Sequence, residues 1–247
     1  MKPFADHFSS IAARYAAYRP RYPQALADAL AERSPARDAA WDAGCGNGQL
    51  SVLLAAHFAH VYAHEPSQAQ LDAATPHPRV EYKCAPAETS GLPDASVDLA
   101  VAAQAAHWFD WSRYVAEVGR VTRPGGLVAL VSYGIMLLDG EAGELVARYY
   151  RDDVGAYWPP GREHVEDGYR NLAWPWPAVE APAIDMRAEW TRDELMGYVA
   201  TWSATVKRAE LVGTGAYDAL GEKLAAMWPD GERRTIRWPL AVRLARR

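Results

Sequence analysis

The sequence places two carboxylates around a loop with three glycines in five positions. Residues 41–49 read W-D-A-G-C-G-N-G-Q, so Asp42 directly precedes the loop, and Glu65 follows 23 residues after Asp42. Each glycine weakens a regular element by roughly 0.5–1 kcal/mol relative to alanine, and in return it allows a sharp turn that a ligand can approach closely. A carboxylate at the end of the next strand can accept hydrogen bonds from both hydroxyls of a ribose. The pattern predicts a nucleoside site, in which Asp42 suits an ammonium or sulfonium charge.

The spacing of the glycines argues against a ligand with phosphates. Gly44, Gly46 and Gly48 form G-x-G-x-G, whereas the dinucleotide fingerprint needs its third glycine three residues after the second. Gln49 and Leu50 follow where a phosphate-binding P-loop has its lysine and hydroxyl residue. A nucleotide-dependent oxidoreductase, one alternative for such a loop, is therefore disfavoured.

The overall composition is that of an acidic globular protein. The chain has 247 residues, of which 50% are hydrophobic, and a formal net charge of −5. Binding to nucleic-acid phosphates needs clustered Lys and Arg, so no nucleic-acid partner is expected. No run of about 18 apolar residues and no signal-peptide pattern occurs, which predicts no membrane span. The two cysteines match no zinc or redox spacing, so we expect no metal and a cytoplasmic location.

Short apolar stretches alternate with amphipathic ones in the first half of the chain. Strands are expected at 39–43, 61–65, 80–84, 97–103 and 127–132, and helices at 22–33, 50–54, 67–74 and 111–121. This alternation predicts right-handed βαβ units and a parallel sheet covered on both faces. Ligands of such sheets bind beyond the carboxyl ends of the strands, where the glycine loop would lie.

The alternation ends near residue 134. Trp-Pro pairs at 158–160 and 174–177 cannot occupy a central strand or a helix interior, so they predict rigid, aromatic-lined loops. Beyond them we expect a strand at 184–190, a helix from about 192 to 210 capped by Thr191, a helix at 217–227 and a last strand at 236–244. Pro239 indicates an edge or a bulge in that last strand. The expected fold class is α/β: a Rossmann-like doubly wound sheet, mostly parallel with an antiparallel last strand, plus a helical and aromatic cap.

Residues 41–48 resemble motif I of the class I methyltransferases that use S-adenosylmethionine (SAM). The resemblance covers residues 40–132 in the family's order and spacing, through the acidic strand end at 61–66, Ala87-Glu88, Leu92-Pro93, S-V-D-L-A (96–100), Q-A-A-H-W-F-D (104–110) and R-V-T-R-P-G-G (120–126). Residues 15–23, Y-A-A-Y-R-P-R-Y-P, are similar to the type 11 branch that includes trans-aconitate methyltransferase-like enzymes. The T-W-S at 201–203 resembles that branch more loosely.

The resemblance implies SAM as cofactor, S-adenosylhomocysteine (SAH) as product and four parts of the chain. These are cofactor-covering N-terminal helices at 1–35, a SAM-binding α/β core at 36–133, a cap or substrate insertion at 134–183, and C-terminal strands and helices that complete the sheet at 184–247.

The resemblance also implies roles for individual residues. Gly44 and Gly46 would let the backbone approach the methionyl part of SAM. Asp42 would lie near the amino group of the cofactor, and Glu65 would hold the ribose. The backbone carbonyl of Gln104 would face the methionyl ammonium.

Four further residues complete the implied cofactor site. Ala87 would offer its backbone amide to the adenine, Arg19 would pair with the methionyl carboxylate, and Tyr15 would close over the cofactor. Many relatives have an Asp before the Ala-Glu pair, where this chain has Pro86. Recognition of the adenine would then fall to the backbone or to Glu88.

The expected chemistry needs little acid–base help. Methyl transfer from a sulfonium is an in-line displacement with an activated leaving group, so the enzyme mainly aligns the nucleophile and excludes water. A base contributes only if the nucleophile arrives protonated. His107, expected just beyond the fourth strand, is the candidate catalytic residue. The alternative is that His107 and Trp108 pack over the cofactor and His107 never titrates in the reaction.

The acceptor is expected to be a small molecule with a carboxylate or a hydroxyl group. Aromatic and cationic residues gather in the cap region, and the candidate substrate residues are Trp108, Tyr157, Trp158, Arg162 and Arg170. No N/D-P-P-aromatic motif of the amino-methylating enzymes occurs. The alternative is a methyltransferase-like module that binds SAM or another nucleoside without methyl transfer. The atom that is methylated and the oligomeric state stay open.

Overall fold

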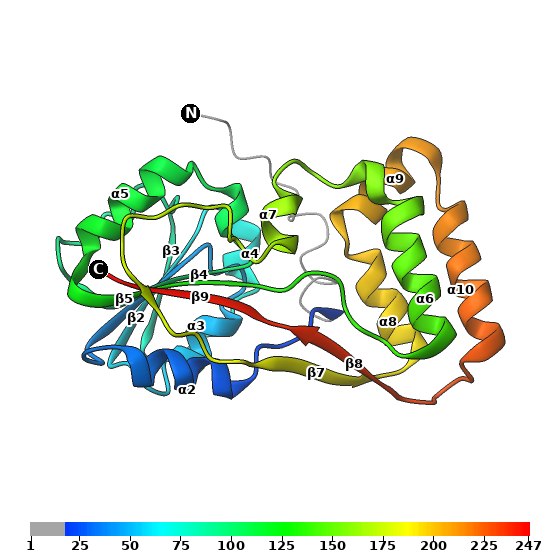
Figure 1. The fold of residues 1–247 in the computed structure, drawn as a ribbon, viewed down its shortest axis with the longest axis horizontal. Helices are drawn as coiled ribbons and strands as arrows, with labels where there is room; N and C mark the ends of the chain where they lie inside the picture. Colours follow the sequence, from blue (N-terminus) through cyan, green and yellow to red (C-terminus); the bar gives the residue numbers. More distant parts are fainter. Residues whose placement is uncertain (1–17) are drawn as a thin grey trace.

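A seven-stranded sheet forms the centre of the computed structural model, which describes residues 18–247 (Figure 1). Its strand order is β3-β2-β1-β4-β5-β9-β6. The strands are β1 (Ala39–Ala43), β2 (His60–Glu65), β3 (Val80–Cys84), β4 (Val97–Ala103), β5 (Thr122–Ser132), β6 (Ala178–Val179) and β9 (Ala241–Arg246). Strands β1 to β5 pair in parallel, whereas β9 runs antiparallel to β5 and to β6. The sheet confirms the expected Rossmann-like class, mostly parallel with an antiparallel last strand.

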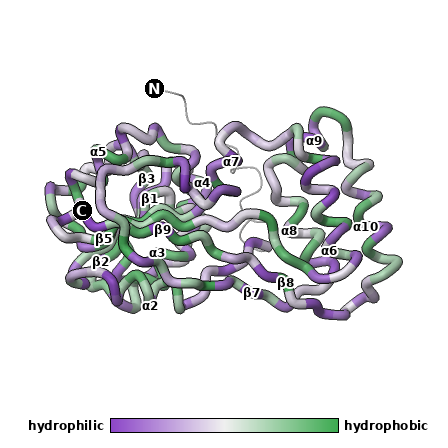
Figure 2. Tube along the Cα trace, viewed as in Figure 1, coloured by the Kyte–Doolittle hydropathy of each residue, from purple (hydrophilic) through white to green (hydrophobic). Residues whose placement is uncertain are grey.

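Helices cover both faces of this sheet. They are α2 (Gln24–Arg33), α3 (Gln49–Leu54), α4 (Gln68–Asp72) and α5 (Trp111–Val121). On one face, Leu30 of α2 and Leu54 of α3 pack with Leu99, and on the other face Tyr114 of α5 packs with Trp41. Because both faces are covered, the central strands are apolar at almost every position. Figure 2 shows hydrophobic residues along β5 and β9 in the middle of the molecule.

A group of helices stands beyond the carboxyl end of β5 (Figure 1). It contains α6 (Gly140–Arg148), a π-helical turn η2 (Tyr149–Asp153), a 3-10 turn η3 (Gly155–Tyr157), α8 (Arg192–Ala200), α9 (Ser203–Val212) and α10 (Gly215–Met227). Helix α7 (Arg162–Glu166) stands apart from this group in Figure 1 and contacts the 3-10 turn η1 (Ala106–Trp108) after β4. Helix α6 packs against α10, and α9 packs against η3. Helix α6, from the expected cap at 134–183, therefore shares one helical layer with α8, α9 and α10 from the expected C-terminal part at 184–247.

The single helix expected at about 192–210 is wrong, because the structure has two helices. Thr191 caps α8 as expected, and it forms a reciprocal capping box with Glu194. The break follows at Thr201, whose hydroxyl donates to the carbonyl of Tyr198 at 2.7 Å and so competes with the helix ladder. Trp202 is extended there, and its buried indole packs against Tyr149 and other cap aromatics.

The last strand is also divided where one strand was expected. Strand β8 (Arg234–Pro239) pairs with β7 (Asp185–Trp190) in a separate two-stranded sheet, and β9 begins only at Ala241. Proline has no N–H for a ladder, and the next amide, that of Leu240, donates to Ile184 instead. Within residues 18–247, no helix is long and apolar enough to cross a membrane.

Candidate active site

The glycine loop joins β1 to α3 at the carboxyl edge of the sheet. Gly44, Gly46 and Gly48 have φ values of +71°, +56° and +80°, a region that residues with a Cβ rarely adopt. A Cβ at Gly44 would lie 2.6 Å from that of Ala105, so this position needs glycine for packing. At Gly46 the nearest atom, Oε1 of Gln70, would be 3.9 Å away. The backbone of Gly46 is therefore open to close approach by a ligand.

The two acidic residues singled out in the sequence flank this loop. Glu65 ends β2, and its carboxylate accepts the backbone amides of Gly46 at 3.0 Å and Ser67 at 3.1 Å. Asp42 lies in β1 and is fully buried; Ser51 donates to its Oδ2 at 2.7 Å. Burial raises the pKa of Asp42 to about 7.

The other oxygen of Asp42, Oδ1, has no hydrogen-bond partner in residues 18–247. A buried acceptor without a donor costs about 1–3 kcal/mol. An N–H group with positive charge, such as the amino group of SAM, would satisfy this oxygen, so the residues present fit that cofactor.

The remaining expected cofactor residues lie along the same edge. Gln104 follows β4 at φ +54°, and its side-chain amide donates to the carbonyl of Tyr133 at 2.7 Å. Ala87 is buried, and Oε1 of Glu88 accepts the backbone amide of Asp110 at 2.7 Å. Glu88 therefore uses one oxygen to hold the start of α5.

Of the two expected N-terminal residues, only one can be placed. Tyr15 lies outside the described residues. The guanidinium carbon of Arg19 is 5.7 Å from the ring centroid of Tyr198, and both residues line a pocket between the sheet and the helical layer.

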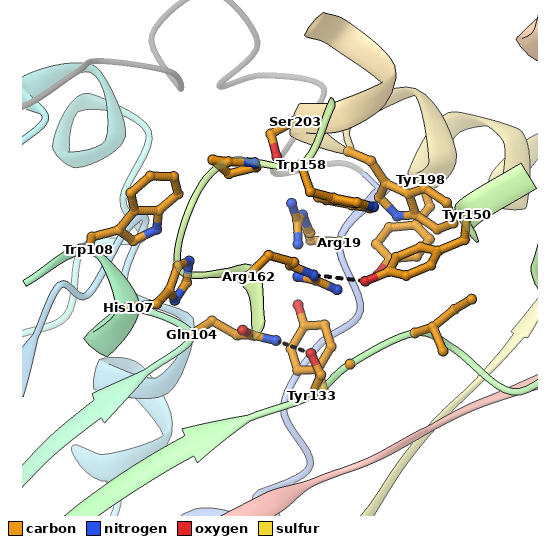
Figure 3. Close-up of a pocket in the computed structure, with 14 residues that line it drawn as sticks. Arg19, Gln104, His107, Trp108, Tyr133, Tyr150, Trp158, Arg162, Tyr198 and Ser203 are labelled. Carbon is orange, nitrogen blue, oxygen red and sulfur yellow. Dashed lines mark hydrogen bonds between the residues drawn. The ribbon is translucent and has the colours of Figure 1, made fainter. Parts of the chain in front are cut away.

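That pocket opens beyond the ends of β4 and β5 (Figure 3). Its lining includes Arg19, Gln104, His107, Trp108, Tyr133, Tyr150, Trp158, Arg162, Tyr198 and Trp202. Two arginines contribute to it, and none of the described lining residues is Asp or Glu. The pocket therefore combines aromatic walls with positive charge.

Arg162, near the middle of the pocket in Figure 3, is held by its neighbours. Its guanidinium lies over the rings of Trp158 and Tyr150, 4.5 and 5.5 Å from their centroids. Its Nε donates to the hydroxyl of Tyr150 at 2.8 Å, and that hydroxyl donates to Glu166. The two terminal nitrogens of Arg162 hydrogen bond to no residue in the described part of the chain.

His107 lies in a 3-10 turn, η1 (Ala106–Trp108), that follows β4. Its Nδ1 is 3.1 Å from the hydroxyl of Tyr169, a fully buried residue in the segment after α7. Burial lowers the pKa of His107 to about 3, and the charges of Arg162, His164 and Arg19 act in the same direction. The imidazole is therefore neutral at pH 7.

The structure brings together three of the five candidate substrate residues. Trp108, Trp158 and Arg162 line the pocket, whereas Tyr157 and Arg170 are not among its lining residues, and Arg170 is exposed. Two other cap tryptophans pack elsewhere: Trp174 and Trp176 contact each other beside the α5 face of the sheet.

Sequence reasoning missed three aromatic residues of the pocket, Tyr133, Tyr198 and Trp202. Only Trp202 carried a signal, as the middle residue of the T-W-S at 201–203. Within residues 18–247, no group of three His, Cys, Asp or Glu side chains is placed so that it could hold a metal ion.

Comparison with known proteins gives consistent matches. Residues 41–130 match the family described as the methyltransferase domain. A methyltransferase-family protein of Dictyostelium discoideum is 33% identical over 223 residues, which cover 89% of this chain and 84% of that protein. A Saccharomyces cerevisiae protein described as a SAM-dependent methyltransferase is 31% identical over 130 residues, 49% of this chain and 45% of that one. A solved structure from Anaeromyxobacter dehalogenans, described as a type II methyltransferase, is 45% identical with a TM-score of 0.87, and the match covers 93% of this chain and 98% of that one.

Proposed function

Because the chain belongs to the class I SAM-dependent methyltransferases, we propose that its pocket holds a small-molecule carboxylate as the methyl acceptor. The observation that carries this proposal is the set of hydrogen-bond donors without partners in the pocket. The terminal nitrogens of Arg162 and the buried Nε1 of Trp158 make no hydrogen bond within the described part of the chain. Such donors, with no acidic residue in the described lining, favour an anionic acceptor over a neutral or cationic one.

For the cofactor, we propose the roles that the motif resemblance implies. Gly44 and Gly46 let the backbone come close to the methionyl part, Glu65 holds the ribose, and Asp42 receives the amino group at its unpartnered Oδ1. SAM bound there would supply an electrophilic methyl group, with the neutral thioether of SAH as the leaving group. Gln104 and Arg19 hold the methionyl end of the cofactor, and this role is supported by the fact that both residues line the pocket. Ala87 and Glu88 bind the adenine; the role that the resemblance implies for Tyr15, closing over the cofactor, falls on a residue outside those the structure describes.

For the acceptor, the proposed work of the protein is binding, alignment and exclusion of water. A carboxylic acid is already ionised at pH 7, so its oxygen needs no base before it attacks. Arg162 binds the carboxylate through its two terminal nitrogens and fixes its direction. The aromatic walls exclude water from the line of attack. A hydroxyl acceptor would need a base, and the low pKa of His107 makes that residue a weak one.

The test pairs cofactor binding with a choice between acceptors. Calorimetry with SAH is run on the wild type, on Glu65→Ala and on Glu81→Ala, whose carboxylate is exposed on β3. We expect binding to the wild type and to Glu81→Ala and a clear loss in Glu65→Ala, since each hydrogen bond to a charged group contributes about 1.5–3 kcal/mol. A nicotinamide dinucleotide serves as the ligand that should not bind.

Methyl transfer is then measured with radiolabelled SAM and matched acceptors. Each aromatic or aliphatic carboxylic acid is paired with its primary alcohol and its amide. The proposal expects label only in the acids, as esters that mild base hydrolyses. Label in the alcohols or amides alone would refute the carboxylate acceptor.

A further inference from the structure

The phenol of Tyr169 is held in a fixed position against His107. The two rings are nearly parallel, with an interplanar angle of 22°, and the hydroxyl of Tyr169 lies 3.1 Å from Nδ1 of His107. Tyr169 has φ +62°, a strained conformation for a residue with a Cβ that persists only where the surroundings impose it. Here its backbone amide donates to His164 at 2.7 Å, and Arg243 of β9 donates to its carbonyl.

The partners of the phenolic oxygen determine where its proton points. The backbone amides of Ala106 and His107 face that oxygen. An amide can only donate, so neither can take the phenolic proton, and Nδ1 of His107 is the one acceptor within hydrogen-bond distance of the hydroxyl in residues 18–247. Burial raises the pKa of Tyr169 far above its usual value, so the phenol keeps this proton. An imidazole that accepts at Nδ1 while neutral carries its hydrogen on Nε2.

On the basis of the proposed carboxylate acceptor, we propose that Tyr169 is a positioning residue that holds His107 in the Nε2–H tautomer. His107 then donates to the acceptor carboxylate beside Arg162, and it is not a general base.

The surroundings of His107 agree with this assignment. Nε2 makes no hydrogen bond with residues 18–247, and His107 lines the pocket, so the Nε2–H group can meet a ligand there. The charged and titratable groups that face the ring are Arg162, His164, Arg19 and the phenol of Tyr169, and the cations oppose its protonation. A Cβ at Gly161 would lie 3.1 Å from the carbonyl of His107, so the start of α7 packs tightly on the turn that carries the ring.

The first test needs neither cofactor nor acceptor. Two-bond ¹H–¹⁵N correlation spectra of the histidine side chains are recorded at pH 7 for the wild type and for Tyr169→Phe. We expect the wild-type spectrum to show His107 with hydrogen on Nε2 and an accepting Nδ1, and a mixture of tautomers in the variant. His64, buried on β2, is the internal control and should not change. Hydrogen on Nδ1 in the wild type, or an unchanged His107 in Tyr169→Phe, would overturn the inference; if the variant does not fold, the wild-type spectrum still decides.

The second test separates a donor from a base. Gln at position 107 can present an N–H near the place of Nε2 but cannot take up a proton. With a carboxylate acceptor, we expect His107→Gln to stay within about 10-fold of the wild-type kcat/KM and His107→Phe to lose about 10- to 100-fold. Equal loss in both variants would overturn the donor role. Methylation of alcohols alone, with His107 still in the Nε2–H tautomer, would refute the carboxylate acceptor and leave the positioning by Tyr169 intact.

Discussion

The guanidinium of Arg162 lies over the indole of Trp158, with its central carbon 4.5 Å from the ring centroid. Stacking fixes the plane of the guanidinium, and the bond from Nε to the hydroxyl of Tyr150 fixes its rotation. The edge with the two terminal nitrogens is therefore oriented before any ligand arrives. A carboxylate that meets this edge can form two parallel hydrogen bonds at little cost in side-chain entropy.

Substitution of Arg162 should weaken acceptor binding more than cofactor binding. Lysine keeps the charge but loses the planar fork and the stacking, so we expect Arg162→Lys to raise KM for a carboxylate acceptor about 10-fold. Arg162→Gln removes the charge as well, and about 100-fold is expected. Steady-state kinetics measure both values, and calorimetry should find SAH affinity nearly unchanged. Arg170→Gln, at an exposed arginine of the same segment, is the matched control; a KM effect of equal size there would contradict the role of Arg162.

Binding of SAH should release a proton from Asp42. Burial raises the pKa of this carboxyl to about 7, so at pH 6.5 it is largely protonated in the ligand-free protein. An ammonium placed at Oδ1 favours the ionised form and lowers the pKa. Calorimetry at pH 6.5 in two buffers with different ionisation enthalpies should therefore report a net release of up to one proton. At pH 8.5 the release should vanish.

The control for this linkage is Asp42→Asn, in which SAH binding should release no proton at pH 6.5 or at pH 8.5.

The raised pKa of Asp42 also predicts how the stability of the ligand-free protein depends on pH. A carboxyl whose pKa rises from 3.8 in the unfolded chain to about 7 in the fold binds its proton more tightly when folded, so its contribution to stability is present below pH 4 and lost as the pH rises through 7. The ligand-free wild type should therefore lose stability relative to Asp42→Asn between pH 4 and 7. Proton uptake on binding, or no pH-dependent difference, would contradict the assignment.

The elements around the glycine loop could be predicted because their signals are local. Strands β1, β2 and β4 are short apolar runs that end in turns, and the acidic end of β2 at Glu65 follows from that boundary alone. The division between β8 and β9 could be predicted only in part, because Pro239 indicated an edge or a bulge but not a change of sheet. Residues 236–244 read as one strand, and only the pairing of Leu240 with the distant Ile184 shows where the chain changes sheets.

The pocket was predictable only in part, for a similar reason. His107 and Trp108 belong to a motif with a fixed place after β4, so their location followed from the sequence. Arg162 and Arg170 are eight residues apart, and the sequence offers no way to tell which of them enters the pocket. Only the contact of Arg162 in α7 with Tyr150 in the π-helical turn places Arg162 there. Tyr133 and Tyr198 enter from elements far apart in the chain, a meeting that no local pattern encodes.

Replacement of Gly48 by alanine should cost more stability than the same change at Gly125. Both glycines have similar φ values, +80° and +76°, so both variants carry the strain of a left-handed alanine, about 1–2 kcal/mol. At Gly125 no atom lies within 4 Å of the added Cβ, whereas at Gly48 the Cβ would lie 2.1 Å from the hydroxyl oxygen of Tyr82. Urea denaturation should show a lower midpoint for Gly48→Ala. Equal midpoints would mean that Tyr82 moves away without cost.

The buried carboxylate of Asp98 joins three strands at the edge of the sheet opposite the glycine loop. Its Oδ2 accepts the backbone amides of Asp38 and Ala39 at the start of β1, and Arg123 of β5 donates to Oδ1 at 2.5 Å. Asp98 itself lies in β4 and is 1% exposed. Asp98→Ala would leave two amides and one guanidinium without this partner. Each buried donor left without a partner costs about 1–3 kcal/mol, so we expect a clear drop in the free energy of unfolding.

Asp94→Ala is the matched control for Asp98→Ala. Asp94 also contacts an arginine, Arg120, at 2.6 Å, but its side chain is 80% exposed. An exposed pair contributes about 0–1 kcal/mol, so urea unfolding should find this variant close to the wild type. Because Asp98 lies at the amino end of β4, the fraction of Asp98→Ala that is folded should still bind SAH with wild-type affinity. Weakened SAH binding by folded Asp98→Ala would show that this carboxylate also affects the cofactor site. Equal destabilisation by the two substitutions would contradict its role in joining the strands.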